Sequence, residues 1–246
     1  MMELAIIGGS GLTSLKNLEV TRREVVYTPY GEPSGPLTHG TLCGKAVVFL
    51  PRHGYGHTIP PHMINYRANL QALKQIGVKK VIAVAAVGSI RADLVPGSMV
   101  IPDQIIDYTW ARAHTFFDGG GTPVTHIDFT HPYSAELRAL LLKGCASAGL
   151  ACSSQATYGA TQGPRLETTA EINRMERDGC DIVGMTGMPE AALAAELGLA
   201  YATCAVVANM GAGRGADGIS MVDIEYNLKQ AMENVRTLLE HVIALI

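Results

Sequence analysis

The residues from Lys79 to Ser89, KKVIAVAAVGS, predict a strand at the centre of a sheet. Seven consecutive apolar residues, Val81 to Val87, show neither the alternation of a half-exposed strand nor the stripe of a helix. Such a run is typical of a strand that is covered on both faces. It ends at Gly88, where the missing Cβ lets a ligand approach the backbone. Because ligands of α/β sheets bind beyond the carboxyl ends of the strands, we expect the site just past Ala86.

Residues 1–246 are long enough for one large α/β domain or two small ones, and the lack of a linker favours one. Apolar residues make up 48% of the chain and charged residues 17%, with no linker and no internal repeat. The low charge suggests that other subunits cover part of the surface. A net charge of −3 argues against a nucleic-acid partner, which requires a basic stripe. Five cysteines without CxxC spacing, and the lack of a signal peptide or a long apolar span, favour a cytoplasmic protein that does not enter a membrane.

Polar residues follow the first predicted strands of the chain. The strand from Glu3 to Ile7 precedes the turn GGSG, in which Ser10 and successive N–H groups would form an anion-binding nest. An ordinary tight turn explains the same pattern. The strand from Ala46 to Leu50 precedes Arg52 and His53, and a guanidinium binds phosphate through two parallel hydrogen bonds. These residues predict an oxyanion site.

The histidines after this strand also allow a metal site. His53, His57 and His62 lie close together in the sequence. Glycines and prolines between them break any helix that would align them, and no carboxylate-bearing zinc motif is present. We therefore favour the oxyanion site, and the alternative for His57 and His62 is that backbone groups satisfy them.

The second half of the chain repeats the pattern of polar residues at strand ends. Thr168 and Glu171 form a capping box, which leaves Glu167 free to face a ligand. Thr186 follows a strand from Asp181 to Met185, and Asn209 follows one from Tyr201 to Ala208. A cation, two hydroxyls, an amide and a carboxylate would meet at one edge of the sheet, and this set suits an oxyanion together with a heterocycle.

Other segments are predicted from periodicity and from helix-capping and helix-ending residues. They are a helix from Met63 to Ile76, a strand from Met99 to Ile106, a surface loop from Thr109 to Thr125, a helix from Ser134 to Gly149, a strand from Ala156 to Thr161, a helix begun by Pro189 and a final helix with an apolar face from Leu228 to Ile246.

Five motifs together resemble one known family. IIGGSGL, PRHGYGHTIPPHMINYRANLQALK, GSIRADLVPGSMVIPDQIID, QGPRLET and GMTGMPEAALAAELGL occur in this order. The chain resembles the trimeric purine nucleoside phosphorylases, and more closely their methylthioadenosine phosphorylase branch. The resemblance implies a three-layer α/β/α domain around a mixed, partly barrel-like sheet, assembled as a homotrimer. It also implies cleavage of a purine nucleoside by inorganic phosphate as co-substrate, without a metal or an organic cofactor.

The resemblance also implies roles for individual residues. Phosphate would be held by Ser10, Arg52, His53, Ala86 and Thr186. The nucleoside would lie against Leu166, Glu167, Met185, Asn209, Met210 and Gly211. The pocket for the 5′ group would be lined by Met221, Val222 and His126, the last from a neighbouring subunit. Arg52, His53 and Asn209 would act in the reaction itself, with Asn209 stabilising the departing base.

This sequence departs from the methylthioadenosine branch where the base and phosphate are bound. Ala85 replaces a phosphate-binding threonine, and Leu166 replaces an aromatic residue. Glu167 replaces a serine, and Asn209 and Gly211 replace two aspartates. An ionised Glu167 would attract the N1–H of a 6-oxopurine, and Asn209 would donate to its O6. The alternative for Glu167 is a salt bridge to Arg165.

The segment from Gly218 to Asp223 bears on the 5′ group. It is apolar at Met221 and Val222 and lacks the histidine with which phosphorylases of ordinary nucleosides hold a 5′-hydroxyl. The sequence therefore predicts a 5′-methylthio-6-oxopurine nucleoside, 5′-methylthioinosine, as the substrate. A 5′-methylthioadenosine phosphorylase, a general 6-oxopurine nucleoside phosphorylase, a hydrolase of the same bond and a non-catalytic nucleoside-binding protein remain the alternatives.

Overall fold

The central strand of the protein is β5 (Lys80–Ser89), as the apolar run predicts. The computed structural model describes residues 4–119, 121, 123–215 and 218–246; Glu3, predicted to begin the first strand, lies outside them. β5 pairs in parallel with β1 and β11 and, at its last two residues, antiparallel with β10. All its residues from Val81 to Ser89 are buried except Ala86, which is half-buried. The exception marks the point at which the sequence predicts a ligand.

The described strands form one mixed sheet. Its main path runs β2-β3-β4-β1-β5-β10-β9-β7, and β11, β6 and β8 branch from β5, so the sheet remains open between its ends. The strands are β1 (Leu4–Gly8), β2 (Glu19–Glu24), β3 (Leu37–Leu42), β4 (Lys45–Pro51), β5, β6 (Met99–Val100), β7 (Gln104–Asp107), β8 (Cys152–Ser153), β9 (Thr157–Ala160), β10 (Ile182–Gly184) and β11 (Ala200–Met210).

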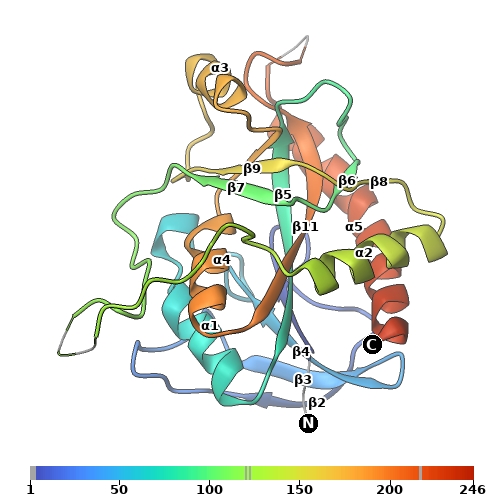
Figure 1. Ribbon diagram of the computed structural model, residues 1–246. Helices are drawn as coiled ribbons and strands as arrows, with labels where there is room; N and C mark the ends of the chain where they lie inside the picture. Colours follow the sequence, from blue (N-terminus) through green and yellow to red (C-terminus); the bar gives the residue numbers. More distant parts are fainter. Residues whose placement is uncertain (1–3, 120, 122, 216–217) are drawn as a thin grey trace.

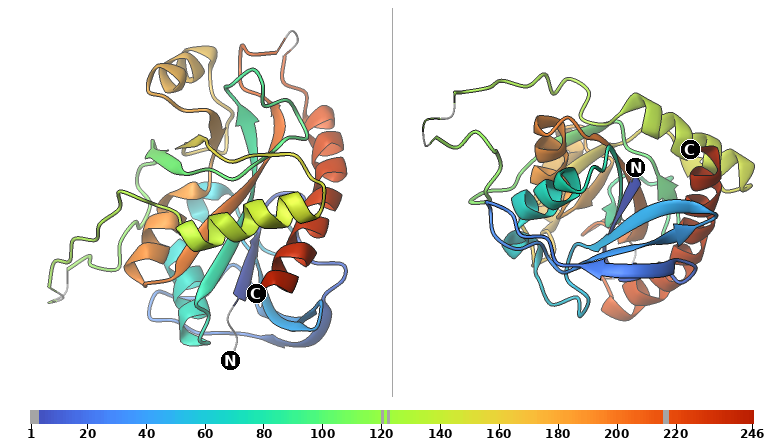
Figure 2. Two further views of the ribbon diagram at one scale, coloured as in Figure 1. Left: turned by 45° about the vertical axis from the view of Figure 1, so that its right-hand side comes forward. Right: turned by 90° about the horizontal axis from the view of Figure 1, so that it is seen from below.

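Helices cover the sheet on two opposite sides, which confirms the three-layer arrangement. The helices are α1 (Tyr66–Gln75), α2 (Ala135–Ser147), α3 (Thr169–Arg177), α4 (Gly187–Glu196) and α5 (Met221–Leu245), with a 3₁₀ turn at Pro61–Met63. α1 and α4 lie on one side of β5 and β11, and α2 and α5 lie on the other (Figures 1 and 2).

The residues of β1 show how one strand serves both layers. Ala5 and Ile7 pack in the apolar core beneath α1 and α4, whereas Leu4 and Ile6 pack in the core beneath α2 and α5. Successive side chains of a strand point to opposite faces. A strand that is apolar at every position is therefore what a sheet between two helical layers requires.

Several segments differ from the sequence-based expectation. The predicted strand from Met99 to Ile106 is two strands, β6 and β7, because the residues between them bond to Ser153 and Ala156 outside the ladder. The exposed strand β2, EVTRRE, has no apolar alternation to reveal it, and β3 was likewise not predicted. β11 extends to Met210, so Asn209 lies within the strand rather than beyond it.

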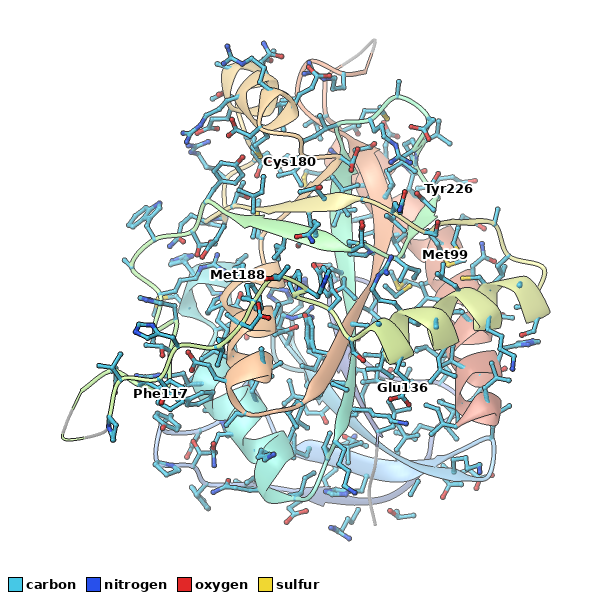
Figure 3. The ribbon with its side chains drawn as sticks, in the orientation of Figure 1. Met99, Phe117, Glu136, Cys180, Met188 and Tyr226 are labelled. Atoms are coloured by element: carbon cyan, nitrogen blue, oxygen red, sulfur yellow. The ribbon has the colours of Figure 1, made fainter. Side chains whose placement is uncertain are left out.

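Several predicted helix ends are confirmed. The capping box of Thr168 and Glu171 is present at the start of α3, and Ser134 caps α2. In α4, Met188 has a non-helical backbone, so the regular helix begins at Pro189. Glu136, which is labelled in Figure 3, lies in the first turn of α2. It pairs with Lys80 at the start of β5, with 2.9 Å between Nζ and Oε1. Over the described ranges, no helix is both long and apolar enough to cross a membrane.

Candidate active site

A cavity of about 340 Å³ lies where the sequence predicts the site. Its wall comes from the residues that end or follow β1, β4, β5, β9, β10 and β11 and from the start of α5. The predicted site residues that line it are Ser10, Arg52, His53, Ala86, Leu166, Glu167, Met185, Thr186, Asn209, Gly211 and Met221. The fold therefore brings together side chains from segments that span the whole chain.

Three residues predicted for the site lie outside this wall in the single chain. Met210 is not part of the lining, although Asn209 and Gly211 on either side of it are. Val222 is 75% exposed, and the α5 residues Ile224 and Leu228 line the cavity beside Met221 instead. A helix turns by about 100° per residue, so the neighbour of an inward-facing residue points elsewhere. His126 is exposed on the long loop.

Arg52 is held in the cavity wall by a buried ion pair. Its Nε and Nη2 donate to the two carboxylate oxygens of Glu190 at 2.7 Å each, and its Nη1 donates to the Val84 carbonyl at 2.8 Å. Both side chains are almost completely buried. Burial disfavours the charge of Arg52, but Glu190 outweighs this effect, so the pKa of the guanidinium lies above its usual value. A guanidinium has five N–H groups, and three of those of Arg52 are engaged by Glu190 and Val84. Two N–H groups therefore remain for a ligand.

Glu190 is a residue that sequence analysis missed. It is fully buried in the first turn of the regular part of α4, and the Tyr201 hydroxyl donates to its Oε1 at 2.8 Å. Burial raises the pKa of Tyr201 well above its usual value, which keeps the hydroxyl a donor. The signal in the sequence is a carboxylate in the first turn of an apolar helix, and that pattern by itself suggests a helix start.

His53 presents an unprotonated nitrogen to the cavity. Its Nδ1 lies 2.8 Å from the carbonyl of Ile59, so Nδ1 carries the proton and donates. Burial, with the charge of Arg52 as the second cause, lowers the pKa of His53 to about 4. At neutral pH the ring is therefore neutral, and its Nε2 is a hydrogen-bond acceptor.

His57 also belongs to the cavity wall, although backbone groups were expected to satisfy it. Its Nε2 lies 3.0 Å from the Ser10 hydroxyl, and its ring centroid lies 4.6 Å from that of His53. A protonated Nε2 would donate to Ser10 and leave the Ser10 hydrogen for a ligand. Within the described part of the chain, no three His, Cys, Asp or Glu side chains are placed to hold a metal ion.

Glu167 and Asn209 form the polar part of the wall away from Arg52. Glu167 accepts from the Thr161 hydroxyl at 2.6 Å, while Arg165 pairs with Glu171 at 2.7 and 2.8 Å. The alternative in which Arg165 binds Glu167 is thus not the arrangement observed. Asn209 donates one amide hydrogen to the Met210 carbonyl at 2.8 Å, which leaves the second hydrogen and the oxygen available.

The long loop after β7 contributes a buried arginine that the sequence does not reveal. Arg112 is only 7% exposed and donates to the carbonyls of Thr161, Gln162, Met185 and Met188 at 2.6 to 3.2 Å. These carbonyls belong to the two segments that carry Glu167 and Thr186. Through Arg112, the predicted surface loop is therefore hydrogen-bonded to both sides of the cavity. Two residues of this loop, Gly120 and Thr122, lie outside the described residues.

A larger cavity of about 420 Å³ adjoins the first. Glu167 lines both cavities, and the larger one is otherwise bounded by residues such as Tyr108, Trp110 and Arg174. None of the residues predicted to bind phosphate lines the larger cavity. The residues predicted to bind phosphate therefore meet in the smaller cavity.

A fold of this kind, with a cavity at the ends of its central strands that contains a buried arginine, is that of a nucleoside phosphorylase. The chain belongs to the phosphorylase superfamily, whose family model matches residues 3–244.

Individual relatives are similar over almost the whole chain. A probable S-methyl-5′-thioinosine phosphorylase of Pseudomonas syringae pv. tomato is 50% identical, over 99% of each chain. A 6-oxopurine nucleoside phosphorylase of Pyrococcus furiosus is 44% identical, over 100% of this chain and 94% of its own. Among solved structures, methylthioadenosine phosphorylase from Schistosoma mansoni in complex with adenine has a TM-score of 0.95 and 32% identity, over 100% of this chain and 92% of that one.

Proposed function

We propose that the protein cleaves S-methyl-5′-thioinosine with inorganic phosphate to give hypoxanthine and S-methyl-5-thioribose 1-phosphate. The observation that carries the proposal is that Glu167 and Asn209 share one cavity with Arg52, Ser10 and Thr186. A carboxylate acceptor and an amide donor match the N1–H and O6 of a 6-oxopurine. They mismatch adenine, which presents an acceptor at N1 and a donor at the exocyclic nitrogen.

In the proposed reaction a phosphate oxygen attacks C1′ while the bond from C1′ to N9 breaks. The electron pair of that bond passes to the purine, and N7 takes up a proton from water to complete neutral hypoxanthine. The two remaining N–H groups of Arg52 and the hydroxyls of Ser10 and Thr186 hold phosphate on one face of the sugar. The neutral Nε2 of His53 accepts a hydrogen bond from the protonated oxygen of phosphate. Asn209 stabilises the charge that develops on the departing base.

The apolar side chains at the start of α5 support a methylthio group at the 5′ position. Met221, Ile224 and Leu228 line the cavity together. A methylthio group gains free energy from burial against such residues, whereas a hydroxyl there loses its water partners. Relatives named for S-methyl-5′-thioinosine, such as that of Pseudomonas syringae, support the same substrate.

A general 6-oxopurine nucleoside phosphorylase is the second candidate. The Pyrococcus furiosus relative bears that name, and Glu167 and Asn209 suit any 6-oxopurine. The two candidates differ only at the 5′ end. A 5′-methylthioadenosine phosphorylase, the name of the Schistosoma mansoni structure, fits less well, because a carboxylate would face the lone pair of adenine N1.

The proposal is tested by following base release from 5′-methylthioinosine, 5′-methylthioadenosine, inosine and adenosine. We expect rapid hypoxanthine release from 5′-methylthioinosine that requires phosphate. Efficient adenine release from 5′-methylthioadenosine, by protein free of deaminase, would contradict the assignment of the base. Equal release without phosphate would indicate a hydrolase instead, and stoichiometric binding without product would indicate a binding protein.

A further inference from the structure

Thr161 lies at the junction of the segments that build the base-binding part of the cavity. It directly follows β9, and its backbone N–H donates to the carbonyl of Gly184 at the end of β10 at 2.7 Å. Its own carbonyl accepts from Arg112 at 3.2 Å. Bonds on both sides fix the backbone of Thr161, and this fixes the position from which its side chain starts.

The hydroxyl of Thr161 is directed at Glu167. The distance from Oγ1 to Oε1 of Glu167 is 2.6 Å, while the Gly184 carbonyl lies 3.2 Å from the same hydroxyl. One hydroxyl has one hydrogen, and the shorter bond to a charged acceptor is the stronger of the two. The hydrogen therefore serves Glu167, and the other carboxylate oxygen remains as an acceptor.

No cation of its own segment holds Glu167. Arg165, two residues earlier, is engaged by both carboxylate oxygens of Glu171. Glu167 is half-buried and borders both cavities, so its carboxylate has room to turn towards either one. The Thr161 hydroxyl is the contact that selects one orientation.

We propose that Thr161 is a positioning residue that orients the Glu167 carboxylate towards the N1–H of the purine and so sharpens selection of 6-oxopurines. The inference rests on the proposed function, because it assigns Thr161 to the base-binding part of that site. Thr161 lines the larger cavity rather than the smaller one, and it reaches the base-binding part of the site through its hydrogen bond to Glu167, which borders both cavities.

Replacing the hydroxyl by a methyl group isolates this effect. Thr161→Val keeps the shape of the side chain and both backbone hydrogen bonds. We expect kcat/KM for 5′-methylthioinosine to fall about tenfold, the usual effect of losing one hydrogen bond to a charged group. The KM for phosphate should stay unchanged. Thr161→Ser, which retains the hydroxyl, should recover activity to within about threefold of the wild type.

A double-mutant cycle separates positioning from a general structural role. In Glu167→Ala protein, Thr161→Val should have almost no further effect on kcat/KM, because the carboxylate through which Thr161 acts is gone. Thr157→Val, the same replacement at the start of β9, is the matched control and should leave kcat/KM unchanged. If the Thr161→Val protein does not fold, Thr161→Ala tests the same prediction, because it removes the hydroxyl without adding a methyl group.

The outcomes are decisive for the inference. The inference is overturned if Thr161→Val and Thr161→Ala both keep the wild-type kcat/KM. It is also overturned if Thr161→Val lowers kcat/KM by the same factor whether Glu167 is present or replaced. The proposed function has a separate readout in the same experiment, namely the base that the wild-type protein releases. If wild-type protein releases adenine in preference to hypoxanthine, the proposed function fails whatever the Thr161 variants do.

Discussion

Arg52 and Glu190, 138 residues apart in the sequence, form a bidentate ion pair that is almost completely shielded from solvent. Each charge depends on the other, since an unpaired charge in this environment costs several kcal/mol. Arg52 is thereby held rigid with part of its guanidinium free for an anion. The same contact contributes to folding and to the proposed phosphate site.

Replacing Glu190 by glutamine should weaken both stability and phosphate binding. Glu190→Gln leaves the buried Arg52 charge without a carboxylate, and we expect a loss of about 3 kcal/mol and a Tm lowered by roughly 6–12 °C. The KM for phosphate should rise about tenfold, with a smaller change for the nucleoside. Calorimetry and steady-state kinetics measure these effects.

The control for this variant is an exposed ion pair. Glu136 pairs with Lys80 but is 65% exposed, so Glu136→Gln should change stability by less than about 1 kcal/mol. If Glu190→Gln were as mild as Glu136→Gln, the buried pair would not have the role described.

Changing Asn209 to aspartate should reverse the preference for the base. A carboxylate repels O6 of hypoxanthine and accepts from an exocyclic amine, so 5′-methylthioinosine cleavage should fall about a hundredfold relative to 5′-methylthioadenosine. Asn173→Asp makes the same charge change at an exposed position of α3 and should leave the ratio unaltered. A side chain at Gly211 would approach the Ser89 carbonyl to 3.1 Å, so Asn209 is the cleaner position to change. An unchanged ratio in Asn209→Asp would remove Asn209 from base recognition.

The start of α5 should determine selectivity at the 5′ position. Met221 lines the cavity, whereas its neighbour Val222 is 75% exposed. We expect Met221→Ser to lower the ratio of kcat/KM for 5′-methylthioinosine over inosine about fivefold, because apolar contact with the methylthio group is lost. Val222→Ser is the matched control and should preserve the ratio. Equal kcat/KM for the two substrates in wild-type protein would contradict the assignment of this pocket.

His53 should make stability depend on pH between about 4 and 6.5. Its pKa is about 4 in the folded protein against 6.5 when unperturbed, so the unfolded chain binds the proton more tightly. The contribution of neutral His53 to the free energy of unfolding is complete above pH 6.5. It is lost as the pH falls towards 4, and it amounts to roughly 3 kcal/mol at most. Urea unfolding at several pH values measures the slope. His53→Asn retains a donor for the Ile59 carbonyl and should flatten it; an identical slope in this variant would disprove the claim.

The protein should form a homotrimer in solution. The long loop after β7 exposes Trp110 at 67% and Val124 at 76%, and it also carries His126, predicted to reach the site of a neighbouring subunit. Light scattering should give the mass of three chains of 26.1 kDa, about 78 kDa. A monomer mass at micromolar concentration would refute the prediction, and a hexamer would require a second interface.

The sequence predicts most of the central sheet because β5 and β11 are apolar at nearly every position. It does not predict β2, whose exposed residues carry no hydrophobic pattern. Site residues at strand ends follow from the rule that parallel strands end at one edge. Glu190 and Arg112 do not follow from any local pattern, since their partners lie far away in the sequence. Such contacts become visible only in the folded chain.

Arg112 binds the segments around the cavity mainly by donating to main-chain carbonyl oxygens. A carbonyl is present at every position whatever the side chain, so the side chains of Thr161, Met185 and Met188 are not constrained by these bonds. Gln162 is bound both through its carbonyl and through its side-chain oxygen, which accepts from Arg112 Nε at 3.1 Å. Substitutions that retune substrate choice are therefore compatible with an intact scaffold. One arginine in a distant loop allows the binding residues to diversify while the framework that carries them stays constant.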